Sequence, residues 1–135
     1  MVFAINPEDT TPYVCECDRK LDEDKQTVWH FRSLSVQDSD LLQTVGVNVS
    51  GKGLKEGAIL DALAVGLASW DNFCDENGPI EFETEKRHIP TFKGKRTAVK
   101  ESLLRRIPAG VRMELGLQFV IAQVADQHDE GDAGN

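Results

Sequence analysis

The sequence predicts an α+β fold, with two antiparallel β-hairpins packed against three to four α-helices in a single small domain. Residues 13–17 and 26–32 alternate between apolar and polar side chains, as half-buried strands do. Residues 55–70 have the most apolar helical pattern in the chain. A chain of 135 residues that is 40% hydrophobic suits one domain with a real core. We expect this domain to span residues 1–125, followed by an acidic flexible tail at 126–135.

The first hairpin is predicted from YVCEC (13–17) and QTVWHFR (26–32), which are separated by the charged stretch DRKLDEDK. A period of two places alternate residues on the same face of a strand. The shared faces are Tyr13, Cys15 and Cys17 on the first strand, and Thr27, Trp29 and Phe31 on the second.

Two helices are expected next. Ser35 and Asp38 form an N-cap pair for the first, whose apolar stripe is Val36, Leu41, Leu42 and Val45. Glycines in GVNVSGKG (46–53) then break the pattern. The second helix covers residues 55–70, and its apolar face is Ile59, Leu60, Leu63, Leu67 and Trp70.

The stretch SWDNFCDENGPIEFETE (69–85) predicts a second hairpin with Asn77-Gly78 as its turn, because both residues tolerate the positive φ of a type I′ turn. Pro79 lacks an N–H donor, so an edge position is expected. We expect this hairpin to be anchored on the core by Trp70, Phe73, Gly78 and Phe82.

Pro90 and Gly94 interrupt the basic segment 86–96, which favours a loop there. A short helix is predicted over 97–107, before Pro108. The last apolar segment, residues 110–122, is ambiguous. Its apolar residues alternate as in a strand, but apolar residues three and four positions apart also fit one face of a helix. Its length and its helix-forming residues favour a helix over 109–125.

The net charge of −8 is unevenly spread along the chain. Residues 86–106 hold eight Lys or Arg and one acid, about +7, whereas the remainder holds seven basic and 22 acidic residues, −15. An acidic body argues against nucleic-acid binding, because phosphates repel it. The sequence lacks an apolar run of about 20 residues, so no membrane span is expected. The N-terminus, MVFAINPEDTT, does not resemble a signal peptide, so a reducing cytosol with free thiols is expected.

The acids around Gly78 resemble a calcium loop, with Asp75 and Asn77 at positions 3 and 5. Position 1 would be Phe73 and position 12 Thr84, so both anchoring ligands are missing. A polar turn explains these acids better than a calcium site.

GVNVSGKG is a near miss for a phosphate-binding loop, since Gly53 replaces the Mg²⁺-binding hydroxyl. Cys15 and Cys17, with Cys74 and His30 or His88, have the composition of a zinc site, but one intervening residue is too few for a zinc knuckle. No catalytic frame surrounds the histidines. We therefore expect no catalytic residues, no cofactor and no metal.

Three segments together resemble a group of small tailed-bacteriophage morphogenesis proteins, described as tail assembly chaperone-like or as phage structural proteins. They are DEDKQTVWHFRSLSVQD (22–38), GLASWDNFCDENGPIEFETE (66–85) and SLLRRIPAGVRMEL (102–115). The resemblance implies a non-enzymatic, protein-binding component of virion assembly in the cytoplasm of the infected bacterium or in the virion. It implies binding to other phage proteins (tape measure, tail, capsid or neck components) and self-association. The alternatives are a phage-coded regulator that binds a host protein and a metal-binding module.

Residues 109–125 contain more apolar positions than a single helical stripe requires. Either a deep core position or a partner interface would explain this excess. For the interface, we expect an apolar row on this helix together with basic residues of the preceding segment. The candidate interface residues are Met113, Leu117, Val120, Ile121, Val124, Lys93, Lys95 and Arg96.

Overall fold

A computed structural model describes residues 9–46 and 53–132 and confirms the mixed α+β fold as one small domain. The described chain has four α-helices: α1 (Val36–Val45), α2 (Glu56–Gly66), α3 (Glu101–Leu104) and α4 (Ala109–Asp132). Its strands are β1 (Thr10–Tyr13), β2 (Val28–Arg32), β3 (Leu67–Asp71), β4 (Cys74–Asp75), β5 (Gly78–Pro79), β6 (Thr84–Ile89) and β7 (Gly94–Val99). Short 3₁₀ turns are η1 (Glu16–Asp18), η2 (Glu23–Lys25) and η3 (Pro90–Phe92).

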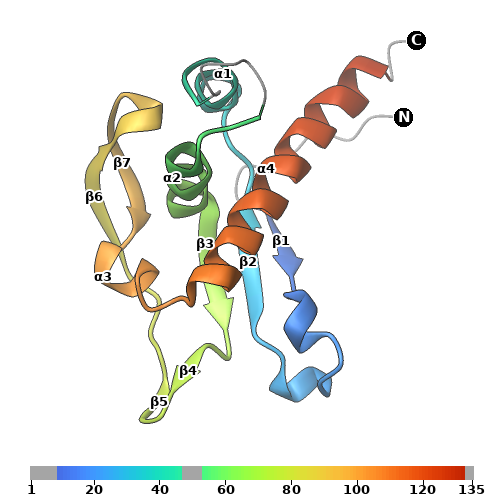
Figure 1. Ribbon diagram of the computed structural model, residues 1–135, viewed down its shortest axis with the longest axis vertical. Coiled ribbons are helices and arrows are strands. Elements are labelled where there is room, and N and C mark those ends of the chain that lie inside the picture. Colours follow the sequence, from blue (N-terminus) through green and yellow to red (C-terminus); the bar gives the residue numbers. More distant parts are fainter. Residues whose placement is uncertain (1–8, 47–52, 133–135) are drawn as a thin grey trace.

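The central sheet is antiparallel with the strand order β1-β2-β3. Trp29 of β2 lies opposite Tyr13 of β1 and Trp70 of β3, which fixes the register of all three strands. Helix α4 crosses this sheet diagonally (Figure 1), and the rings of Phe31 and Phe119 meet with their centroids 5.3 Å apart. The sheet and α4 thus form the two sides of the main core.

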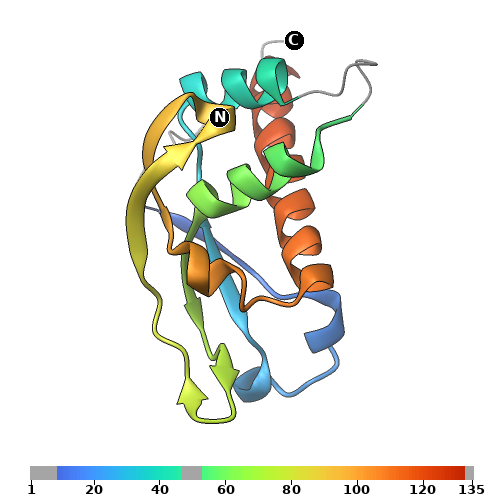
Figure 2. The ribbon, with the colours of Figure 1, turned by 60° about the vertical axis from the view of Figure 1, so that its left-hand side comes forward.

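Helix α2 lies between α4 and the two-stranded ribbon formed by β6 and β7 (Figures 1 and 2). A helix enclosed on several sides is expected to be apolar around most of its circumference. The buried residues of α2 are Ala58, Ile59, Ala62, Leu63, Ala64, Val65 and Gly66. The apolar composition of this segment therefore reflects a central position in the fold.

The predicted helix over 55–70 is too long at its C-terminal end. Helix α2 ends at Gly66, and Leu67 adopts extended dihedral angles of φ −75° and ψ 118°. Residues 67–71 instead pair with β2, and the indole rings of Trp29 and Trp70 pack edge to face at 5.8 Å. Pairing with a distant strand overrides the local helical pattern, because it satisfies the backbone and buries Trp70.

The first strand is also displaced from its predicted position. It occupies Thr10–Tyr13 rather than residues 13–17, and residues 16–18 form η1. Cys15 and Cys17 consequently do not share a strand face, since Cys15 is buried and Cys17 is exposed.

The predicted loop over 86–96 and helix over 97–107 are wrong. Strands β6 and β7 pair from Thr84 opposite Val99 to Ile89 opposite Gly94. The chain reverses through η3, which begins at Pro90, and through Lys93, whose φ of 54° lies in the left-handed region. Only residues 101–104 of the predicted helix are α-helical. The charged residues obscured the strand pattern, because the inward positions of this ribbon are partly polar as well.

The second hairpin exists but turns one residue earlier than predicted. Asp75 pairs with Gly78, so the loop residues are Glu76 and Asn77. Neither has a positive φ, which excludes the predicted type I′ turn, whereas Gly78 has a φ of 122°. The side chain of Asp75 accepts a hydrogen bond from the backbone N–H of Asn77 at 2.8 Å and so stabilises this turn locally.

The predicted helix that carries Leu41, Leu42 and Val45 is confirmed as α1, and Ser35 Oγ accepts the N-cap hydrogen bond from the Asp38 N–H at 3.1 Å. Val36 does not join an apolar stripe, since it is 76% exposed. The final segment is a helix, as predicted, and α4 continues to Asp132, into the expected flexible tail. Residues 47–52 of the glycine-rich segment lie outside the described residues.

Candidate functional site

The hairpin of β4 and β5 is held on the core by a cluster of aromatic rings. Ring centroids are separated by 5.0 Å for Trp70 and Phe73, 4.8 Å for Trp70 and Phe82, and 5.1 Å for Trp29 and Phe73. The Trp70 indole N–H also donates to the carbonyl oxygen of Ile80 at 2.8 Å. The structure thus brings the expected anchor residues Trp70, Phe73 and Phe82 together beside the turn that contains Gly78.

Asp75 is bound within the hairpin rather than free for a ligand. Its carboxylate accepts a hydrogen bond from the guanidinium of Arg106, in addition to the one from Asn77. Arg106 and the Asn77 N–H hold the pKa of Asp75 below its ordinary value. Asp75 therefore acts as a turn residue that also ties the hairpin to the segment after α3.

Helix α4 has two different apolar faces. Leu115, Phe119 and Val120 face the core and are 0%, 1% and 7% exposed. Leu117 and Ile121 point outward and are 41% and 57% exposed. These two outward residues are separated by one helical turn and therefore lie next to each other on the surface.

The expected interface row on α4 is accordingly divided. Val120 is a core residue, so its expected role in an interface is wrong, and Met113 is half-buried. Val124 lies outside the described side chains. Leu117 and Ile121 are the two members of the row that the structure leaves accessible.

The β6–β7 ribbon carries a basic row on its outer face. Lys86, His88 and Lys95 are exposed on this face, with His88 directly opposite Lys95, and Lys93 is exposed at the tip. None of these four side chains forms an ion pair within the described part of the chain. We call Lys86, His88, Lys93 and Lys95 the basic row.

Arg96 does not belong to the basic row, although its neighbour Lys95 does. Its side chain is half-buried and donates to Asp38 Oδ1 at 3.3 Å and to the Phe92 carbonyl oxygen at 3.0 Å. It joins the ribbon to helix α1 and serves the fold rather than a partner.

Glu114 connects α4 to the end of β1 and to the start of η1. Its Oε2 accepts from the Tyr13 hydroxyl at 2.6 Å and from the Glu16 N–H at 3.0 Å. Burial opposes ionisation of Glu114, but the hydrogen bonds from Tyr13, Glu16 and Cys15 outweigh it, and the pKa is lowered. Burial and this carboxylate raise the pKa of Tyr13 to about 12, and likewise that of Cys15 to about 12. Sequence reasoning missed this network, because its members are about 100 residues apart.

No group of three or more His, Cys, Asp or Glu side chains suited to a metal ion occurs in the described part of the chain. Among the described helices, none has the length and apolarity needed to cross a membrane.

Comparisons of this chain with protein-family models, curated proteins and solved structures gave no match.

Proposed function

We propose that this chain is a non-enzymatic, protein-binding component of tailed-phage morphogenesis, either a tail assembly chaperone-like protein or a minor structural protein of the particle. The phage assignment is supported by the resemblance of the segments 22–38, 66–85 and 102–115. The last two of these segments contain the hairpin anchored by Trp70 and Phe82, and the start of α4.

The observation that carries the protein-binding role is the outward apolar pair on α4, Leu117 and Ile121. The opposite side of the same helix supplies Leu115 and Phe119 to the core, so the core does not require the outward pair. Adjacent exposed apolar side chains on one helix face offer a surface against which another protein can pack.

The basic row adds a charged element to this proposal. It lies on a chain whose remaining residues, outside 86–106, carry a charge of −15. Opposite charges on neighbouring molecules steer association and fix orientation. Self-association or binding to another acidic phage protein would use this complementarity, and it would weaken as the salt concentration rises.

The interface test compares aspartate substitutions around one turn of α4. Leu117→Asp and Ile121→Asp place a charge in the proposed contact, so co-expressed tape-measure protein of the source phage should no longer co-purify. Gln118→Asp adds the same charge at a neighbouring exposed position and should retain binding. Val120→Asp should unfold the protein, because it buries a charge in the core. Normal co-purification of Leu117→Asp and Ile121→Asp would rule out α4 as the interface.

The two phage roles are separated by quantitative mass spectrometry of washed particles and of infected-cell lysate. Stoichiometric presence in particles supports the structural protein. Abundance in lysate with absence from particles supports the assembly chaperone. A host protein as the main co-purifying species would instead support the regulator and contradict the proposal.

A further inference from the structure

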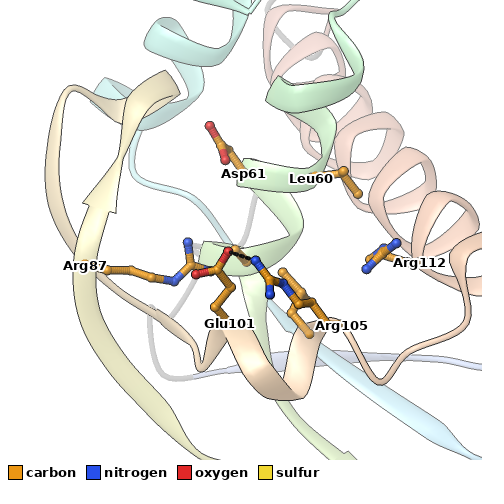
Figure 3. A pocket seen from close by; sticks show the side chains of 8 residues that line it. Leu60, Asp61, Arg87, Glu101, Arg105 and Arg112 are labelled. Atoms are coloured by element: carbon orange, nitrogen blue, oxygen red, sulfur yellow. Dashed lines mark hydrogen bonds and ion pairs between the residues drawn. The ribbon is translucent and has the colours of Figure 1, made fainter.

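A cavity of about 250 Å³ opens between α2, β6, the α3 region and the start of α4 (Figure 3). Its lining residues are Leu60, Asp61, Ala64, Arg87, Glu101, Leu104, Arg105 and Arg112. Three arginines and two acids thus line the cavity together with the apolar side chains of Leu60, Ala64 and Leu104. None of these residues belongs to the outward pair on α4 or to the basic row, so this inference does not depend on the proposed function.

The acids of the cavity are already engaged. Glu101 Oε1 accepts from Arg105 Nη2 at 3.0 Å, and the two side chains point toward each other in Figure 3. Asp61 Oδ2 accepts two hydrogen bonds from Thr91, from its hydroxyl at 2.7 Å and from its N–H at 3.2 Å. Neither acid forms an ion pair with Arg87 or Arg112.

Two arginines therefore keep unused donors. Arg87 Nη2 donates to the Val99 carbonyl oxygen at 3.2 Å, but its Nε is buried without a hydrogen bond. Glu85 Oε2 lies 3.5 Å from this Nε, which permits ionic attraction but falls short of a hydrogen bond. The guanidinium of Arg112 has no hydrogen bond or ion pair to any described residue. Figure 3 shows Arg87 and Arg112 on opposite sides of the cavity.

A buried guanidinium donor without an acceptor is unfavourable, and an oxyanion supplies that acceptor. The planar fork of arginine matches carboxylates in particular, through paired N–H donors. Three arginines and two acids line the cavity, and Glu85, whose Oε2 lies 3.5 Å from Arg87 Nε, adds a third acid beside it, so the formal charges cancel. Asp61 and Glu101 repel a phosphate dianion about twice as strongly as a singly charged carboxylate.

We propose that this cavity binds a carboxylate carried on a short apolar body. The carboxylate accepts hydrogen bonds from the unpaired guanidinium of Arg112, and the apolar body packs on Leu60, Ala64 and Leu104. Free small carboxylic acids and the C-terminal carboxylate of a peptide share this chemistry.

The test is a titration followed by NMR of the backbone amides in the full chain. The probes are butanoate, the uncharged butanamide, inorganic phosphate, and a short peptide that ends in leucine with a free or an amidated C-terminus. Butanoate should give saturable shifts at residues 60–64, 104 and 112, and butanamide should not. Tighter binding of the free-ended peptide than of butanoate assigns the site to peptide termini, and the reverse order assigns it to small acids.

Arg112→Gln should weaken the binding of butanoate by about tenfold, which corresponds to the loss of one hydrogen bond to a charged group. Arg112→Lys keeps the positive charge but lacks the paired N–H donors of the guanidinium, so it should weaken the binding of butanoate less than Arg112→Gln does. Lys95→Gln removes a positive charge outside the cavity and is the matched control, with no expected change. The native amide spectrum of each variant shows that it is folded. Equal binding of butanamide, tighter binding of phosphate, or unchanged affinity in Arg112→Gln would each overturn the proposal.

Discussion

Gly66 and Phe119 are in contact with no room for a methyl group between them, since a Cβ built on Gly66 would lie 2.2 Å from Cζ of Phe119. The Phe119 ring is 1% exposed and also packs against the ring of Phe31, with the two centroids 5.3 Å apart. This contact lies where α2 ends and β3 begins, directly beneath α4. The close approach of α4 to this junction therefore requires glycine at position 66.

We expect Gly66→Ala to lower the free energy of unfolding by about 1–3 kcal/mol, the usual cost of overpacking a tight core. Gly57→Ala is the matched control, because it lies in the same helix and a Cβ there meets no atom within 4 Å. The control should leave stability unchanged or raise it by at most about 1 kcal/mol through helix propensity. Urea denaturation of both variants measures the difference, and equal stabilities would contradict the packing argument.

Tyr13→Phe should lower stability at neutral pH by about 1 kcal/mol, since it removes a partly exposed hydrogen bond to Glu114. It should also change the alkaline pH dependence. The pKa of Tyr13 is 10.0 in the unfolded chain and about 12 in the folded protein, because burial and Glu114 raise it. The unfolded state therefore loses this proton first, and the wild type loses stability as the pH rises from 10 to 12.

Urea midpoints measured at intervals from pH 8 to pH 12 test this expectation. The decline above pH 10 should be shallower in Tyr13→Phe than in the wild type. Part of the decline should remain in the variant, because burial and Glu114 also raise the pKa of Cys15 from 9.0 to about 12. Identical slopes for the two proteins would show that Tyr13 titrates alike in the folded and unfolded states.

Phe82→Ala should loosen the hairpin of β4 and β5, because it removes the ring that packs edge to face on Trp70. We expect a loss of about 1–3 kcal/mol, below the cost of a fully buried phenylalanine. Amide hydrogen exchange of residues 74–78 and of Ile80 should accelerate more than that of α2. Glu81→Ala changes an exposed neighbour and should have little effect. Unchanged exchange in Phe82→Ala would show that the hairpin holds itself in place.

The sequence predicted elements well where local signals agreed. The Ser35 cap marked the start of α1, and the helix formers after Pro108 indicated α4. It failed at residues 67–71, where a helical pattern continues but pairing with β2 decides the structure. It failed again in the ribbon, because the inward residues Glu85 and Arg87 are charged like their outward neighbours, so no apolar alternation indicates the strand.

The candidate binding residues also show which features local sequence signals predict and which depend on tertiary contacts. Apolar spacing selected a row on α4, but it did not distinguish Leu117, which is exposed, from Val120, which is buried. No sequence pattern distinguishes Arg87 and Arg112 as cavity residues, because the cavity is formed by elements that are distant along the chain. Glu114 accepts a hydrogen bond from Tyr13 across the fold, and the two residues are too far apart in the sequence for local patterns to relate them.

The sequence by itself therefore determined the α+β class, the capped helix α1, the final helix and the aromatic residues of the hairpin, since these depend on local propensity and periodicity. The tertiary structure decided where α2 becomes β3, that the basic segment forms a ribbon, and which side of α4 faces outward. Those features depend on contacts between distant segments, such as Gly66 with Phe119, whose energies exceed local preferences of a few tenths of a kcal/mol per residue, about the scale of helix propensity.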